Sequence, residues 1–230
     1  MSHGGNHRRS PYILKSPFPA EEQDYIPVVN DNLYLLGSIL NNFVSAVRLY
    51  QFANSVSNTS KQYRHSLRPP IHPDTEISDW RFIAARDGAM TLYHFSEVMQ
   101  MLRNVRSRSR TLYDNLDLEI YKSANRKMQS LIPNLEKLRH GVAHVTKKTS
   151  SKEAMTEHGL TDTQGEYGIK ITGCSSINVT DCFYGDRFIH NWEGKMLSYD
   201  VNFTTVKNVQ DIKDLMWSSF EKAAYWSNSF

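Results

Sequence analysis

The sequence predicts a mainly α protein, a bundle of four or five helices that carries a small antiparallel β-meander before its C-terminal helix. Two observations lead to this prediction. Between residues 31 and 148, apolar residues recur every three or four positions, which is the period of an amphipathic helix. Between residues 167 and 201 the period shortens toward two, and turn residues separate the apolar runs, as in short antiparallel strands.

The composition places the chain among globular proteins. It has 230 residues, of which 40% are hydrophobic and 22% are charged, and its formal net charge is +3. That charge is compatible with a nucleic-acid partner but does not require one. Two cysteines are too few for a disulfide scaffold or a Cys-rich zinc site.

No apolar run approaches the roughly 18 residues of a membrane span, and the first residues lack the apolar region of a signal peptide. We therefore expect a cytoplasmic protein with no membrane partner. Residues 1–25 are predicted to form a flexible basic tail, because glycine, serine, proline and basic residues occur there without periodicity. Residues 26–150 are predicted to form the helical core, and residues 151–230 the β-meander and C-terminal helix, packed on the same domain.

Four helices are expected in the core, over residues 31–55, from residue 78 into the arginine-rich run 103–110, over 116–131 and over 133–148. The last begins at a proline, which the first turn of a helix tolerates. The polar stretch 57–75 contains three prolines and predicts a long loop.

After a loop over residues 149–165, four short strands are expected, over residues 167–172, 177–184, 187–192 and 196–201. Glycine-containing turns separate these strands, which indicates a meander. A helical period returns from Thr204 and predicts the C-terminal helix.

The most informative stretch is PNLEKLRHGVAHVTKK (133–148), which places Arg139, His140 and His144 on one short helix. A metal site is one interpretation, because His140 and His144 are four residues apart and share a helix face. The zinc-protease pattern, however, needs a glutamate where Gly141 stands, and no cysteine or carboxylate pair nearby completes a ligand set. We therefore expect no metal and no cofactor. A second interpretation gives these side chains ordinary structural or surface roles.

The third interpretation is RNA cleavage. Arg139, four intervening residues and His144 form an R-x4-H motif, with His140 directly after the arginine. This pattern on a late helix of an α-bundle resembles the HEPN superfamily (higher eukaryotes and prokaryotes nucleotide-binding). WRFIAARDGAMTLYHF (80–95) looks like the second helix of its abortive-infection-type branch, and EGKMLSYDV (193–201) is similar to that branch's C-terminal extension. The resemblance covers roughly residues 31–220.

The resemblance implies a metal-independent endoribonuclease, in which the ribose 2′-OH attacks the adjacent phosphate and leaves a 2′,3′-cyclic phosphate. His144 is then expected to act as general acid/base, because imidazole titrates near neutrality. Arg139 would stabilise the charge of the transition state with its forked donors. His140 would orient the site or contact phosphate, and Asp87, in the RDGA sequence, would orient Arg139.

The resemblance also implies a homodimer. Positions 139 and 144 lie about 140° apart around a regular helix, so their side chains do not share a face. Family members form one composite cleft from the motif helices of two subunits, and Gly141 is expected to let the two backbones approach closely.

The expected substrate is RNA, either tRNA or mRNA, in a bacterial defence or toxin–antitoxin role. Its phosphates are expected to contact Arg103, Arg106, Lys147 and Lys148. Thr146 stands where one toxin subgroup has a tyrosine that a partner nucleotidyltransferase modifies, which argues against that pairing but leaves the expected cleavage intact. An antidote protein is a further expected partner. The alternative function is a non-catalytic HEPN-like dimer that binds RNA, a nucleotide or a protein partner.

Overall fold

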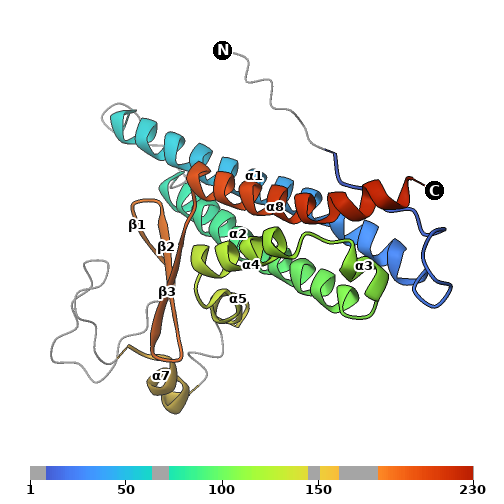
Figure 1. Cartoon of the computed structure of the whole chain (residues 1–230). Helices are drawn as coiled ribbons and strands as arrows, with labels where there is room; N and C mark the ends of the chain where they lie inside the picture. Colours follow the sequence, from blue (N-terminus) through green and yellow to red (C-terminus); the bar gives the residue numbers. More distant parts are fainter. Residues whose placement is uncertain (1–8, 64–72, 145–150, 161–180, 230) are drawn as a thin grey trace. The chain divides into compact units, whose positions relative to one another are not determined.

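The structure, a computed structural model, describes residues 9–63, 73–144, 151–160 and 181–229 (Figure 1). It is mainly helical, with a small antiparallel sheet before the C-terminal helix, and so confirms the predicted fold class. Within these ranges the helices are α1 (Tyr25–Tyr63), α2 (Pro73–Arg106), α3 (Arg110–Asp114), α4 (Leu118–Leu131), α5 (Leu135–Ala143), α7 (Lys152–His158) and α8 (Phe203–Ser227). The strands are β1 (Cys182–Tyr184), β2 (Arg187–Trp192) and β3 (Lys195–Asp200).

The chain divides into two compact units, each with its own core. The first unit comprises residues 1–40, 95–130 and 208–230, and the second comprises residues 41–94 and 131–207. The long helices α1, α2 and α8 each contribute residues to both units.

In the first unit, α8 packs against α1 and α4. The indole Nε1–H of Trp217 donates a hydrogen bond to the carbonyl of Leu33 at 2.9 Å. On the α4 side, the ring of Phe220 meets that of Tyr121 edge-on, with 6.3 Å between centroids. Apolar residues at helical spacing form this core, including Leu33, Leu36, Phe95, Leu102, Leu112, Ala124, Ile212, Met216 and Phe220.

The N-terminal segment differs from the flexible tail expected over residues 1–25. Ile13 and Phe18 are only 1% and 3% exposed. The carboxamide of Asn30 accepts from the N–H of Ile13 at 3.0 Å and donates to its carbonyl at 2.9 Å. The ring of Phe18 meets that of Trp226 edge-on, 5.1 Å between centroids. Residues 1–8 lie outside the described part of the chain.

Several helix boundaries differ from those predicted. The polar segment after residue 57 continues α1 to Tyr63, and α2 begins at Pro73, so the loop expected over residues 57–75 is too long. A proline fits there because the first helical residue needs no hydrogen-bonded N–H. Helix α5 ends at Ala143, well before the predicted Lys148.

Two short helices were not predicted, and a serine caps each of them. Ser151 Oγ accepts from the N–H of Ala154 at 3.1 Å at the start of α7, inside the loop expected over residues 149–165. Ser109 Oγ accepts from the N–H of Leu112 at 3.2 Å at the start of α3. Serine is a favoured N-cap because its hydroxyl satisfies a backbone donor that the helix leaves unpaired.

In the second unit, the strands form an antiparallel sheet of order β1-β2-β3. Strand β2 covers the residues predicted for it, and β3 lies within one residue of its prediction. The last three residues of the predicted strand 177–184 form β1, whereas residues 177–180 and the predicted strand 167–172 lie outside the described residues. Helix α5 packs against β2. The buried apolar and aromatic side chains of the sheet are those of Phe188, Ile189, Trp192, Leu197 and Tyr199.

A search of the described helices for a long apolar segment finds none able to cross a membrane.

Candidate active site at the end of helix α5

Helix α5 carries the predicted motif and is held by one apolar face. Leu135, Leu138 and Val142 recur at steps of three and four and are buried. Asn134 precedes the helix with φ of 62°, a left-handed conformation that asparagine adopts more readily than most residues. The opposite side of the helix carries Glu136 and His140, which are open to solvent to different degrees.

Gly141 lies against β2 of its own chain. A Cβ atom at this position would be 2.5 Å from Cδ2 and 2.7 Å from Nε2 of His190, so a larger residue would force the helix or the ring to move. The expectation that Gly141 opens the motif helix to a second subunit is therefore wrong. Glycine is needed here because α5 approaches β2 closely within one chain.

The motif histidine lies just past the end of the helix. His144 is the C-cap of α5, with φ of −123° and ψ of 38°, and its N–H donates to the carbonyl of His140 at 3.0 Å. The angle expected between positions 139 and 144 assumed that both were helical, and His144 is not. Its ring stacks on that of His140, with 6.0 Å between centroids and 22° between planes.

Arg139 completes this group of side chains. Its Nη1 lies 3.3 Å from Nδ1 of His140, and its guanidinium carbon lies 4.9 Å from the ring centroid of Tyr93 on α2. The Nε of Arg139 is buried and has no hydrogen-bond partner within the described residues. The guanidinium is attracted to the face of the Tyr93 ring, which holds the cation in place. His140 thus contacts Arg139 on one side and stacks on His144 on the other.

The solvent side of the group is defined by His140 and Glu136. The His140 side chain is 41% exposed, and its Nε2 lies 3.9 Å from a carboxylate oxygen of Glu136, which is 77% exposed. The group therefore presents imidazole, a side chain suited to proton transfer, and guanidinium, a side chain suited to binding anions, within one cluster.

Asp87 does not reach Arg139 as expected. It is exposed on α2, and no hydrogen bond or ion pair joins these two described residues. Asp87 instead lies close to Tyr199: burial raises the pKa of the Tyr199 hydroxyl well above its ordinary value, and the negative charge of Asp87 adds to that rise. Tyr93 occupies the place beside Arg139 that Asp87 was predicted to take.

The residues predicted to bind substrate are divided between regions. Arg103 and Arg106 belong to the first unit, whereas the motif belongs to the second. Lys147 and Lys148, like Thr146, lie outside the described residues. Arg106 stacks on two tyrosines, with its guanidinium carbon 4.7 Å from the ring centroid of Tyr121 and 5.4 Å from that of Tyr113.

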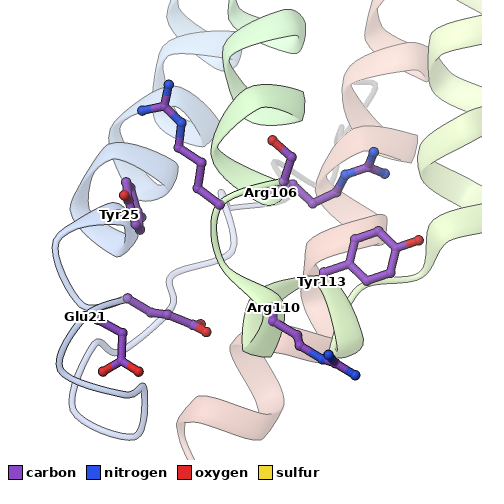
Figure 2. Close-up of a pocket in the computed structure, with 8 residues that line it drawn as sticks. Glu21, Tyr25, Arg106, Arg110 and Tyr113 are labelled. Atoms are coloured by element: carbon purple, nitrogen blue, oxygen red, sulfur yellow. The ribbon is translucent and has the colours of Figure 1, made fainter.

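Arg106 also lines an open pocket of about 660 Å³ in the first unit (Figure 2). The other lining residues are Glu21, Glu22, Tyr25, Ser107, Arg108, Arg110 and Tyr113. Glu22 already has partners, because its carboxylate accepts from the Ser109 hydroxyl at 2.5 Å and from the N–H of Thr111 at 3.2 Å. The lining thus combines three arginines with two glutamates, and the two tyrosines give it aromatic walls.

The structure adds three residues that the sequence analysis missed. One oxygen of Asp181 lies 2.7 Å from Nδ1 of His190, and the other accepts from Nε of Arg86, also at 2.7 Å. The His190 side chain is fully buried. Burial alone would raise the pKa of Asp181, but the hydrogen bonds from His190 and Arg86 outweigh it and lower that pKa. Arg86 and Asp181 are 95 residues apart, so no local pattern could have revealed the pair.

Within the described ranges, no group of three or more histidine, cysteine, aspartate or glutamate side chains is arranged to hold a metal ion. Comparisons of the chain with protein-family models, with curated proteins and with solved structures find no match in any of the three.

Proposed function

We propose that this protein is a metal-independent endoribonuclease of the HEPN type, which cleaves RNA to products with 2′,3′-cyclic phosphate ends. The observation that carries the proposal is the continuous group of Arg139, His140 and His144 at the end of α5. The group pairs a permanent cation with two imidazoles, the combination that RNA transesterification uses.

In the proposed reaction, the ribose 2′-oxygen attacks the adjacent phosphorus while His144 takes up the 2′-hydroxyl proton. The bond from phosphorus to the 5′-oxygen breaks, and that oxygen leaves with a proton from the acid form of an imidazole or from water. No redox partner and no metal ion are needed. The products are a 2′,3′-cyclic phosphate and a 5′-hydroxyl.

Arg139 is proposed to bind the phosphate oxygens as negative charge develops on them. Its Nε is covered, so its outer nitrogens are the donors left to face a substrate. The Tyr93 ring holds the guanidinium plane in one orientation, and His140 fixes one edge of it. His140 is accordingly an orienting residue, which holds the side chains of Arg139 and His144 in fixed positions relative to each other.

The proposal includes a homodimer. The apolar side of α5 is occupied by β2 of the same chain, so a second copy would approach the side that carries Glu136 and His140. The composite cleft requires a dimer at micromolar concentration. Sedimentation of the full chain tests this, and a monomer at that concentration would contradict the composite cleft.

RNA is the proposed partner beyond the dimer, in a defence or toxin role that follows from the resemblance alone. The arginines of the pocket beside Arg106 are a proposed contact for RNA phosphates in the first unit. An antidote protein remains an expectation.

The proposal is tested with purified protein, tRNA and total RNA in the presence of EDTA. Wild type is expected to produce fragments with cyclic phosphate ends. Arg139→Ala and His144→Ala are expected to lower the cleavage rate by about 100-fold or more, the usual contribution of a positioned acid/base or a charge-stabilising group.

Arg126→Ala is the matched control, because Arg126 is an exposed arginine on α4 in the other unit. It is expected to leave cleavage unchanged. RNA that is bound but left intact by wild type would contradict the enzyme proposal and favour the non-catalytic dimer. Equal cleavage by wild type and both site variants would assign the activity to a contaminant.

A further inference from the structure

We propose that His190, held by Asp181 and Arg86, is a positioning residue that seats the motif helix α5 on strand β2. These residues belong to the second unit, as does the motif. The inference rests on the proposed function only for its effect on RNA cleavage. The position of α5 on β2 is argued from contacts alone and does not depend on RNA cleavage.

The first step is the contact between His190 and Gly141. The ring edge of His190 occupies the space where a side chain at position 141 would begin, with Cδ2 2.5 Å and Nε2 2.7 Å from an ideal Cβ. The edge of the His190 ring therefore determines how closely α5 approaches β2. Position 141 lies directly after His140 and three residues before His144, so a shift of the backbone there moves both motif histidines.

The second step is the orientation of the ring. Nδ1 of His190 lies 2.7 Å from a carboxylate oxygen of Asp181. An ionised carboxylate only accepts, so Nδ1 carries the hydrogen of this bond. The Phe188 ring lies nearly parallel to the imidazole, at 22° between planes and 6.4 Å between centroids.

The third step is the anchoring of Asp181. Its second oxygen accepts from Nε of Arg86 on α2 at 2.7 Å, so the carboxylate is held from two sides. Asp181 also has a positive φ of 59°, which turns the chain as it enters β1. Arg86, Asp181 and His190 thus link α2 to the motif helix through the sheet. Through this link, the small sheet positions α5.

The decisive experiment is a double-mutant cycle at positions 141 and 190. Gly141→Ala in the wild-type background is expected to reduce cleavage about 100-fold, because a misplacement of about 1 Å near a reacting group has that effect. In a His190→Ala background the ring is gone, so the same glycine substitution is expected to change the rate less than about twofold. An equal loss in both backgrounds would overturn the proposal.

Gly88→Ala is the matched control. A Cβ at Gly88 would clash with the Tyr199 hydroxyl as severely as one at Gly141 clashes with His190. Both variants are expected to lose stability, but only Gly141→Ala should shift the NMR signals of the His140 and His144 rings. An equal shift of those signals in Gly88→Ala would overturn the proposal, because general loosening of the unit would then explain the effect.

Nitrogen-15 NMR of the imidazoles provides a readout that does not depend on cleavage. The His190 ring is expected to show hydrogen on Nδ1 in wild type, and to lose that preference in Asp181→Ala together with a shift of the His140 and His144 signals. If wild type cleaves no RNA but Asp181→Ala shows these shifts, the ribonuclease proposal is contradicted and the proposed role of His190 is supported. If wild type cleaves RNA but the His140 and His144 signals shift in neither Asp181→Ala nor Gly141→Ala, only the proposed role of His190 is refuted.

Discussion

Two pairs of histidines in the second unit contrast sharply. His140 and His144 stack at the end of α5, where the His140 side chain is 41% exposed. His158 and His190 are buried, the former stacked on Trp192 at 4.2 Å between centroids and the latter bonded to Asp181. All four residues are histidines, so the residue type does not distinguish the two pairs. Their burial and their hydrogen-bond and stacking partners do. The buried pair is built into the packing, and the other pair is placed where a substrate can reach it.

The largest expected difference between the pairs is in stability. His190→Ala is expected to lower the free energy of unfolding by roughly 1.5–3 kcal/mol, because it removes a hydrogen bond to the buried carboxylate of Asp181, which keeps its contact with Arg86. His140→Ala is expected to change it by less than about 0.5 kcal/mol, as for most exposed positions. Urea denaturation followed by circular dichroism measures both. Similar losses in the two variants would break the contrast.

The next prediction concerns acid. The pKa of Asp181 is lowered in the folded state, so its ionised form stabilises the protein at pH values above the unfolded-state pKa of about 3.9. This contribution is lost as the pH falls through the lower folded-state pKa. Asp181→Asn lacks it, so the stability gap between wild type and this variant should be constant above about pH 5 and shrink toward pH 2. Denaturation curves across that range would show a gap independent of pH if the carboxylate contributed nothing.

A smaller effect is expected at His158. Its Nδ1 accepts from the N–H of Glu193 at 3.4 Å, and its ring stacks on Trp192. His158→Phe keeps an aromatic ring there but removes the acceptor, so we expect a loss of about 1 kcal/mol in the free energy of unfolding. Cleavage should be unchanged. His158→Ala serves as comparison and should cost more, since it also removes the stack; an equal cost would show that the stack is unimportant.

The smallest effect is expected at the exposed pair. Glu136→Gln removes a carboxylate 3.9 Å from His140, at a separation and exposure where ion pairs contribute little. We expect a change in stability below about 0.5 kcal/mol and less than a twofold change in cleavage rate. Melting temperature and initial rates measure these quantities. A larger drop in cleavage would give Glu136 a place in the site itself.

Periodicity predicted the elements whose faces are buried. The pattern over residues 116–131 matches α4 to within two residues at its start, and residues 187–192 coincide with β2. Both elements carry an apolar face against a core, which is the property that periodicity measures. Helix α1 continues beyond residue 57 through serine, asparagine and threonine, and a polar run gives no such signal.

The site was predictable only in part, for a related reason. The spacing of Arg139 and His144 is a local pattern, and it led to the group that the structure brings together. Tyr93 beside Arg139 and His190 against Gly141 are long-range neighbours. Nothing in the local sequence indicates which tyrosine or histidine will be carried there by the fold. The expected role of Asp87 failed to appear for the same reason, since a helix position does not fix which neighbour its side chain meets.

The anchoring of the N-terminal segment bears on how the oligomeric state is measured. Removing residues 1–25 as a dispensable tail would also remove Ile13 and Phe18 from the first unit, and would leave Asn30 and the Trp226 ring without their neighbours. The trimmed protein would expose an apolar surface of the kind that drives self-association. A dimer of such a shortened protein could result from the newly exposed apolar surface and not from the motif helices. Sedimentation must therefore use the full chain with its first residues intact.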